Sequence, residues 1–156
     1  MGESGGKCHK VGGVPMLMGT YEHKVDSKGR TVLPAKFRQE LGQCVVATIG
    51  IDQCVSIYPM NHWSRVLEKL QELPFSKSKS RGLMRVMLAS AHELPIDNAG
   101  RILIPQLLRD HANLQSDALF VGVSDHIELW DKQLWDEYSL QVMEALPAIA
   151  EEIEGF

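Results

Sequence analysis

The chain contains two related seventeen-residue segments, and this duplication limits its fold more than any other feature. The segment DSKGRTVLPAKFRQELG, residues 26–42, aligns without gaps with DNAGRILIPQLLRDHAN, residues 97–113, at an offset of 71. The matching positions are Asp26 with Asp97, Gly29 with Gly100, Arg30 with Arg101, Pro34 with Pro105 and Arg38 with Arg109. Two copies of one structural unit are the natural explanation.

Each copy predicts a β-hairpin tip followed by a short helix. The β-rich stretch MGTYEHKV, residues 18–25, leads into Asp-x-x-Gly, which favours a type I turn with the glycine in the left-handed conformation. Three apolar or β-branched residues then precede a proline suited to the first helical position. Gly42 and Asn113 lie eight residues past the prolines, and both residue types tolerate the conformation that ends a helix.

Two strands and an amphipathic helix are expected after each short helix. The strand-like runs are residues 44–49 with 55–58 in the first copy and 118–123 with 127–130 in the second. A helix follows, and in the first copy its apolar stripe and its expected N-cap are Trp63, Val66, Leu67, Leu70 and Asn61. The unit is therefore β-hairpin, short helix, two strands and helix, written twice, and the predicted class is α+β.

The chain divides into five predicted segments. Residues 1–15 hold five glycines and few large apolar side chains, so we expect a flexible leader that is a tag or otherwise non-native. The other segments are a first repeat over 16–76, a connecting helix over 77–90, a second repeat over 91–143 and an acidic C-terminal tail over 144–156. Pro147 interrupts a helical pattern, and we expect the tail after it to be solvated and mobile.

Charge is distributed unevenly along the chain. The total of −4 divides into +1 over residues 1–15, +5 over 16–90 and −10 over 91–156. Such asymmetry suggests one face for a polyanion and an acidic remainder that stays away from it. The alternative is a solvated acidic C-terminal helix without further meaning.

The sequence gives little support for an enzyme. Cys8, Cys44 and Cys54 form no CxxC pair, and buried free thiols are expected rather than a disulfide between Cys44 and Cys54. The six histidines lack the spacing of a zinc site. We therefore expect no catalytic residue, no metal and no cofactor. The lack of a secretory signal and of an apolar run near the ~18 residues of a membrane span predicts a cytoplasmic protein.

From about Met18 to Tyr138 the chain resembles the MraZ family, bacterial regulators of the division and cell-wall gene cluster. The resemblance rests on the two DxxxR motifs, the GRxxxP and ELWD sequences, and the aromatic pairs Tyr58/Trp63 and Trp130/Trp135. It implies a pseudo-two-fold, AbrB-like swapped-hairpin β-barrel with peripheral helices. It also implies a nucleoid-associated, ring-like homo-oligomer that binds repeated promoter elements and represses its own operon. The leader lies outside the family pattern, which places the native start at Met16 or Met18.

The resemblance implies DNA binding by the first tip, and simple chemistry supports the same role. A two-stranded β-ribbon enters the major groove, where an arginine gains ~1 to 3 kcal/mol of discrimination from a bidentate contact to guanine. Arg30 is the candidate base contact, whereas lysines suit phosphate and a glycine permits close approach of the backbone. The predicted DNA-binding residues are Lys24, Asp26, Ser27, Lys28, Gly29 and Arg30.

A purely structural role is the alternative for each tip, with the aspartate holding the arginine and the turn amides. The first copy is compatible with both roles at once. The second copy retains Asp97, Gly100 and Arg101, but its other tip positions differ: Pro95, Asn98 and Ala99 replace Lys24, Ser27 and Lys28. The second tip is therefore only a possible DNA contact, and the structural role is favoured there.

Self-association is expected on grounds of magnitude. One tip neutralises ~2 phosphates, whereas specific DNA binders commonly contact ~6 to 10. Several identical tips in one assembly would gain ~10² to 10⁴ in affinity through effective concentration. The rival interpretation is a non-catalytic protein-interaction or antitoxin-like module of the same fold, whose binding would respond little to salt.

Overall fold

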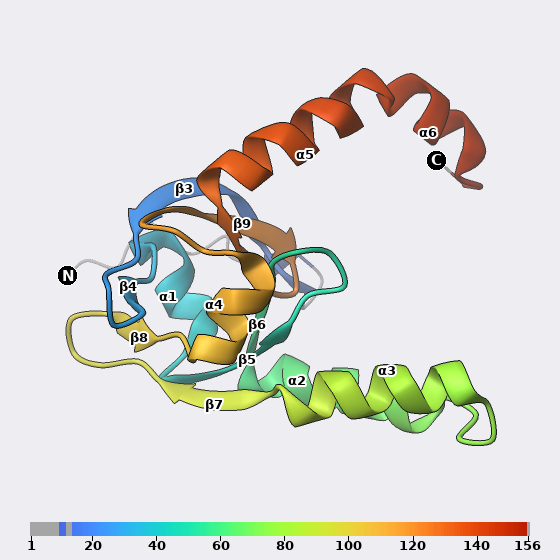
Figure 1. Ribbon diagram of the computed structural model, residues 1–156, viewed down its shortest axis with the longest axis horizontal. Coiled ribbons are helices and arrows are strands. Elements are labelled where there is room, and N and C mark those ends of the chain that lie inside the picture. Colours follow the sequence, from blue (N-terminus) through green and yellow to red (C-terminus); the bar gives the residue numbers. More distant parts are fainter. Residues whose placement is uncertain (1–9, 12–13, 156) are drawn as a thin grey trace.

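A computed structural model describes residues 10–11 and 14–155 (Figure 1). The strands are β1 (Lys10–Val11), β2 (Val14–Pro15), β3 (Leu17–Lys24), β4 (Arg30–Val32), β5 (Cys44–Ile49), β6 (Val55–Pro59), β7 (His92–Pro95), β8 (Arg101–Leu103), β9 (Asp117–Ser124) and β10 (Ile127–Asp131). The helices are α1 (Ala35–Leu41), α2 (Met60–Gln71), α3 (Ser78–Ala89), α4 (Gln106–Ala112), α5 (Lys132–Glu144) and α6 (Leu146–Glu152). The α+β class is confirmed. The predicted leader lies outside the described residues except for the paired strands β1 and β2.

The two repeats exchange strands to build one antiparallel sheet. Its order is β3-β9-β10-β6-β5-β7, and a separate two-stranded sheet joins β4 to β8. The first repeat supplies β3 to β6 and the second supplies β7 to β10. Exchanging the repeats maps this order onto its own reverse, so a pseudo-two-fold axis passes between β6 and β10 and between β4 and β8. Because β3 pairs with β9 and β5 with β7, each repeat needs the other to complete its sheet.

The predicted hairpin is right about the turn and wrong about the pairing. After each tip the chain leaves the sheet of the preceding strand, because β4 pairs with β8 rather than with β3. The two edge strands of the six-stranded sheet are β3 and β7, and in the part of the chain that is described they do not pair with each other. A closed barrel is therefore not found here, although the strand exchange between two tandem units is.

Several predicted helix boundaries shift for a common reason. Pro34 and Pro105 are N-caps rather than first helical residues, since each has an extended ψ that leaves it just outside its helix. Likewise α2 begins at Met60 after the extended Pro59, so Asn61 is not the N-cap. The predicted break at Pro147 occurs at Ala145 instead, and the acidic tail is helical over α6.

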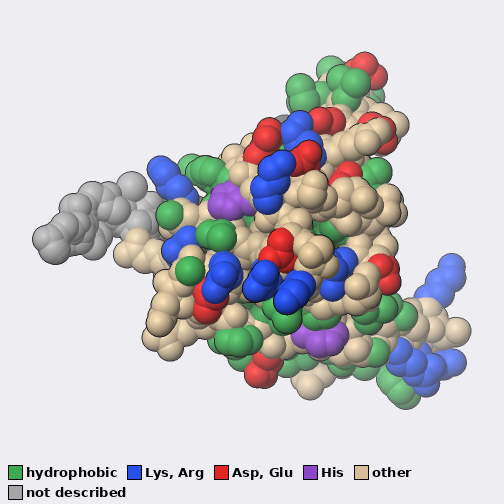
Figure 2. Space-filling view, turned by 60° about the vertical axis from the view of Figure 1, so that its left-hand side comes forward, with side chains coloured by type: hydrophobic (Ala, Val, Ile, Leu, Met, Phe, Trp, Pro, Cys, Tyr) green, Lys and Arg blue, Asp and Glu red, His purple; other side chains and the backbone are tan. Residues whose placement is uncertain are grey.

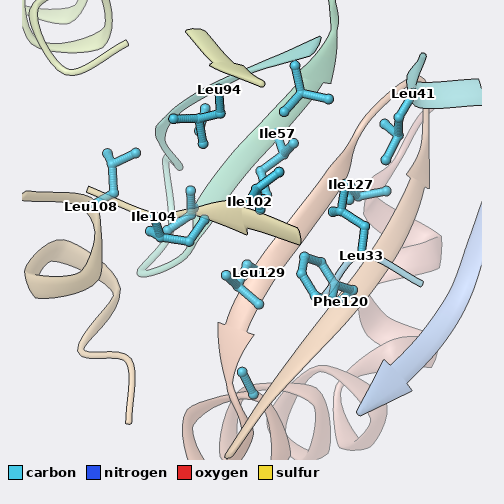
Figure 3. Packing of buried hydrophobic residues seen from close by; sticks show 14 of the residues in the cluster. Leu33, Leu41, Ile57, Leu94, Ile102, Ile104, Leu108, Phe120, Ile127 and Leu129 are labelled. Carbon is cyan, nitrogen blue, oxygen red and sulfur yellow. The ribbon is translucent and has the colours of Figure 1, made fainter. Parts of the chain in front are cut away.

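One core serves both repeats. Equivalent positions of the short helices and their approaches are buried in both copies, namely Leu33 with Ile104, Phe37 with Leu108 and Leu41 with Ala112. Figure 3 shows Leu33, Leu41 and Ile104 of this set in the same cluster as side chains of the sheet strands, including Ile57, Ile127 and Leu129. Leu70 of the predicted α2 stripe is buried, whereas the rest of that stripe is half-buried. Cys44 and Cys54 are free thiols, half-buried and buried respectively.

The two tip loops and the projecting helices lie at opposite ends of the molecule. Figure 1 shows the turns before β4 and β8 at one end, while the pair α2–α3 and the pair α5–α6 project from the other end in different directions. Among the described helices none is long and apolar enough to cross a membrane. The DNA-binding candidates therefore lie on the opposite side from two exposed helical arms.

Candidate nucleic-acid interface

The first loop, residues 26–30, is held by its own aspartate. Asp26 Oδ1 accepts hydrogen bonds from the backbone N–H groups of Lys28 and Arg30, both at 2.9 Å, and Oδ2 accepts one from Arg30 Nε at 2.7 Å. The N–H of Gly29, whose φ is 94°, donates to the Asp26 carbonyl at 2.9 Å. The hydrogen bond from the backbone N–H of Arg30 is the main cause that keeps the pKa of Asp26 below its usual value, and the hydrogen bond from the Arg30 guanidinium adds to it. The tip is thus a fixed loop rather than a loose one.

The clamp leaves Arg30 available for a ligand. Only Nε is engaged, and the side chain remains 47% exposed. Neither terminal amino group of Arg30 donates to any residue that the structure describes. Because these two groups form the end of the guanidinium fork, they suit the paired acceptors of a guanine edge or a phosphate. The structural and the ligand-binding roles of Arg30 are therefore compatible.

The second loop, residues 97–101, has the same geometry. Asp97 Oδ1 accepts from the N–H groups of Ala99 at 2.9 Å and Arg101 at 2.8 Å, and Oδ2 accepts from Arg101 Nε at 2.9 Å. Arg101 is 48% exposed, close to the value for Arg30. The clamp is common to both copies. Any difference in DNA binding between the loops must come from the neighbouring side chains.

Backbone pairing joins the two loops into one unit. The register of β4 and β8 places Arg30 opposite Leu103 and Val32 opposite Arg101. Beyond this ladder, the N–H of Leu33 donates to the carbonyl of Gly100, and the N–H of Ile104 donates to the carbonyl of Gly29, both at 2.8 Å. Figure 2 shows Lys and Arg side chains gathered on the face that carries the loops. This pairing places the loops side by side, which the sequence did not reveal.

Each loop also rests on an arginine from the other repeat. Arg109 of α4 donates from Nε to the Ile104 carbonyl at 3.0 Å and lies under Gly29, where an added Cβ would come within 2.6 Å of that same nitrogen. Arg38 of α1 lies in the same way under Gly100, at 2.1 Å from an added Cβ. Sequence reasoning assigned neither arginine a role. Their match in the duplication was the available signal.

Two of the remaining predicted site residues lie at the tip of the first loop, and the third lies at its margin. Ser27 and Lys28 are exposed at the tip beside Arg30. Lys24 lies at the end of β3 and forms an exposed ion pair with Asp117 of β9. Its hydrogen bond to that carboxylate raises the pKa of Lys24. The structure therefore brings Asp26 to Arg30 together and leaves Lys24 at their margin with a partner of its own.

Within residues 10–11 and 14–155 no group of three or more His, Cys, Asp or Glu side chains is arranged to hold a metal ion. The features that stand out on the loop face are cationic side chains and a braced backbone. Such a surface is suited to a polyanion.

Known proteins resemble this chain over most of its length. A family model described as "MraZ protein, putative antitoxin-like" matches twice, over residues 16–86 and 87–153. A protein from Caldanaerobacter subterraneus subsp. tengcongensis is 47% identical over 141 residues, covering 90% of this chain and 99% of the relative. Proteins from Natranaerobius thermophilus and Moorella thermoacetica are 46% and 40% identical with the same coverage.

All three relatives bear the name "Transcriptional regulator MraZ". Two matches to the family model on one chain agree with the internal duplication and with the pseudo-two-fold exchange of strands. The resemblance noted from the sequence is confirmed, and the chain belongs to the MraZ family.

Proposed function

We propose that this chain regulates transcription by binding double-stranded DNA through the first loop. The observation that carries the proposal is the half-exposed guanidinium of Arg30 on a loop fixed by Asp26. A rigid loop keeps its arginine near the geometry of a base contact, so less conformational entropy is lost on binding. The relatives' name, transcriptional regulator, points to the same function.

In this proposal the first loop enters the major groove. Arg30 contacts a guanine edge through its free amino groups, while Lys28 and the backbone near Gly29 approach the phosphates. Lys24 contributes less, since Asp117 already pairs with it. The second loop mainly supports the first and is the weaker DNA contact, because Ala99 stands where the first loop has Lys28.

The finer parts of the proposal follow from the family resemblance. We propose that the exchanged strands are of the AbrB-like swapped-hairpin barrel type and that several copies form a ring-like homo-oligomer. The ring binds repeated promoter elements upstream of its own operon, acts there as a repressor and is associated with the nucleoid. One copy offers too few phosphate contacts for tight specific binding, and repetition of the loop supplies the rest.

The test is a titration of the protein with a duplex from the region upstream of its own coding sequence. A scrambled duplex of equal length and composition is the control. Specific DNA binding predicts a preference for the upstream duplex and a steep loss of affinity between about 50 and 200 mM salt. Equal affinity for both duplexes, or no binding at low salt, would contradict the proposal.

A non-catalytic protein-interaction or antitoxin-like module is the second candidate. It is favoured by the family description and by the exposed apolar side chains on the projecting helices, among them Leu140 and Met143. Binding of a protein partner through an apolar surface would change little over the same salt range. The same titration, repeated with such a partner, therefore separates the two functions.

A further inference from the structure

The two projecting helix pairs carry opposite charge. The basic arm, residues 60–89, comprises α2 and α3 and contains six basic and two acidic residues. The acidic arm, residues 132–154, comprises α5 and α6 and contains one basic and six acidic residues. Figure 1 shows the arms extending in different directions, so one copy does not pair its own arms.

Charge placement on both arms is unfavourable for isolated helices. Lys79 and Arg81 lie at the start of α3, and Glu151 and Glu152 lie at the end of α6. A helix dipole favours the reverse, with acids near the N-terminus and bases near the C-terminus. Arg81 and Arg85 are also like charges four residues apart, which destabilises a helix. A partner of opposite charge would offset these costs.

Apolar side chains on both arms lack cover. No residue of α5 or α6 is buried. Side chains that are more than half exposed are Leu140, Met143, Leu146 and Ile153 on the acidic arm and Phe75 and Val86 on the basic arm. Helices of this length are marginal in water unless an apolar face packs against something.

From these observations we infer that the acidic arm of one copy docks on the basic arm of a second copy. The contact is head-to-tail, because each copy offers both surfaces and uses them on different neighbours. Such an interface closes into a ring or continues as a filament. It leaves the loop face uncovered, since the loops lie at the other end of the molecule. The inference rests on the self-association in the proposed function and specifies the surfaces that produce it.

The arms provide cations and anions that are free to pair between copies. Among the described residues no salt bridge involves Lys69, Lys79 or Arg85, nor Glu144, Glu151 or Glu152. Arg81 is different, because its guanidinium donates to the carbonyls of Phe75 and Ser76 at 3.1 Å and holds the turn between the helices. Charge reversal therefore tests the interface without removing a salt bridge within an arm when it is made at Lys69, Lys79, Arg85, Glu144, Glu151 and Glu152.

Two variants of the full chain test the inference by light scattering without DNA. The basic-arm variant carries Lys69→Glu, Lys79→Glu and Arg85→Glu, and the acidic-arm variant carries Glu144→Lys, Glu151→Lys and Glu152→Lys. Each variant then has two arms of one sign. We expect self-association of each to weaken by at least about 100-fold, because like charges face each other across the contact. Lysines near the end of α6 favour that helix, so its unfolding does not explain the loss.

Mixing the two variants is the decisive step. In an equimolar mixture each acidic arm again meets a basic arm, and we expect the mass of the wild-type assembly to return. The matched control, Lys36→Glu with Glu93→Lys, reverses exposed charges outside the arms and should keep the wild-type mass. Thermal unfolding of each variant verifies that the shared core is intact.

Three results would overturn the inference. They are a monomeric wild type, a charge-reversed variant that keeps the wild-type mass, and a mixture that stays dissociated although both variants are folded. The second result would indicate a contact between two copies of the same arm, because each variant leaves one arm unchanged. Arg30→Ala should leave the mass unchanged, so failure of DNA binding and failure of the arm contact are observed separately. An assembly that obeys the mixing rule but ignores its promoter would refute only the proposed function.

Discussion

Replacement of Arg30 by alanine should abolish sequence preference while leaving the fold nearly intact. The Arg30–Asp26 ion pair joins two half-exposed side chains, and ion pairs screened by solvent in this way add little to stability. In a chain of this size the loss of the pair lowers the melting temperature by at most about 4 °C. A lost guanine contact costs ~1 to 3 kcal/mol per loop, which is about 5- to 150-fold in affinity. The effect multiplies when an assembly places several loops on DNA.

The matched control is Arg101→Ala. Arg101 has nearly the same clamp distance and exposure as Arg30, so the two variants should lose similar stability. Fluorescence anisotropy with the upstream duplex should nevertheless give a much larger loss of affinity for Arg30→Ala. Arg30→Lys keeps the charge and lacks the planar fork, so it should retain most of the salt dependence but lose the sequence preference.

Equal losses of DNA affinity at the two arginines would refute the assignment of the first loop. Unfolding of Arg30→Ala would refute the separation of the clamp from the DNA contact. Retained sequence preference in Arg30→Lys would show that the planar fork is not what distinguishes the bases.

The other predictions concern the support of the loop and the core. Gly29→Ala should destabilise the protein by more than the ~1 to 2 kcal/mol of a left-handed alanine, because the added Cβ would meet Arg109. Thermal unfolding should show a smaller loss for the control Gly42→Ala, because Gly42 also has a positive φ but has open space around it. Equal losses would argue against the contact with Arg109. Arg109→Ala should lower DNA affinity with the slope of affinity against salt unchanged, because Arg109 positions the loop; a slope reduced by about 1 would mean instead that it contacts phosphate. Cys54 should resist alkylation in the folded protein, since burial raises the pKa of its thiol, and peptide mapping should find Cys44 modified before Cys54. The reverse order would contradict the packing.

Sequence reasoning succeeded where the signal was local. Turn residues at Asp26 and Gly29, proline before each short helix, and alternating apolar runs predicted most elements between residues 17 and 144 near their observed positions, whereas the tail expected to be mobile forms α6. The duplication added that these elements occur twice. Local signals also account for the errors of one residue at helix starts, because a proline's fixed φ fits both the N-cap and the first turn.

Contacts between the repeats could not be predicted in the same way. An alternating strand such as β3 fits any neighbour with an apolar face, and nothing in residues 17–24 shows that β9 rather than β4 is its partner. For the same reason the sequence did not assign Arg38 and Arg109 to the loop of the opposite copy. Long-range pairing depends on the shape of the whole core, which local periodicity does not encode.

The crossed support gives the second loop a part in the proposed DNA binding that does not depend on its own side chains. The carbonyl of Gly100 accepts the N–H of Leu33, directly after β4, and the carbonyl of Gly29 accepts the N–H of Ile104. If the second loop lost its clamp, the ladder that positions the first would loosen with it. In the proposed function the second repeat therefore contributes through geometry, although its own tip presents Asn98 and Ala99 in place of a serine and a lysine.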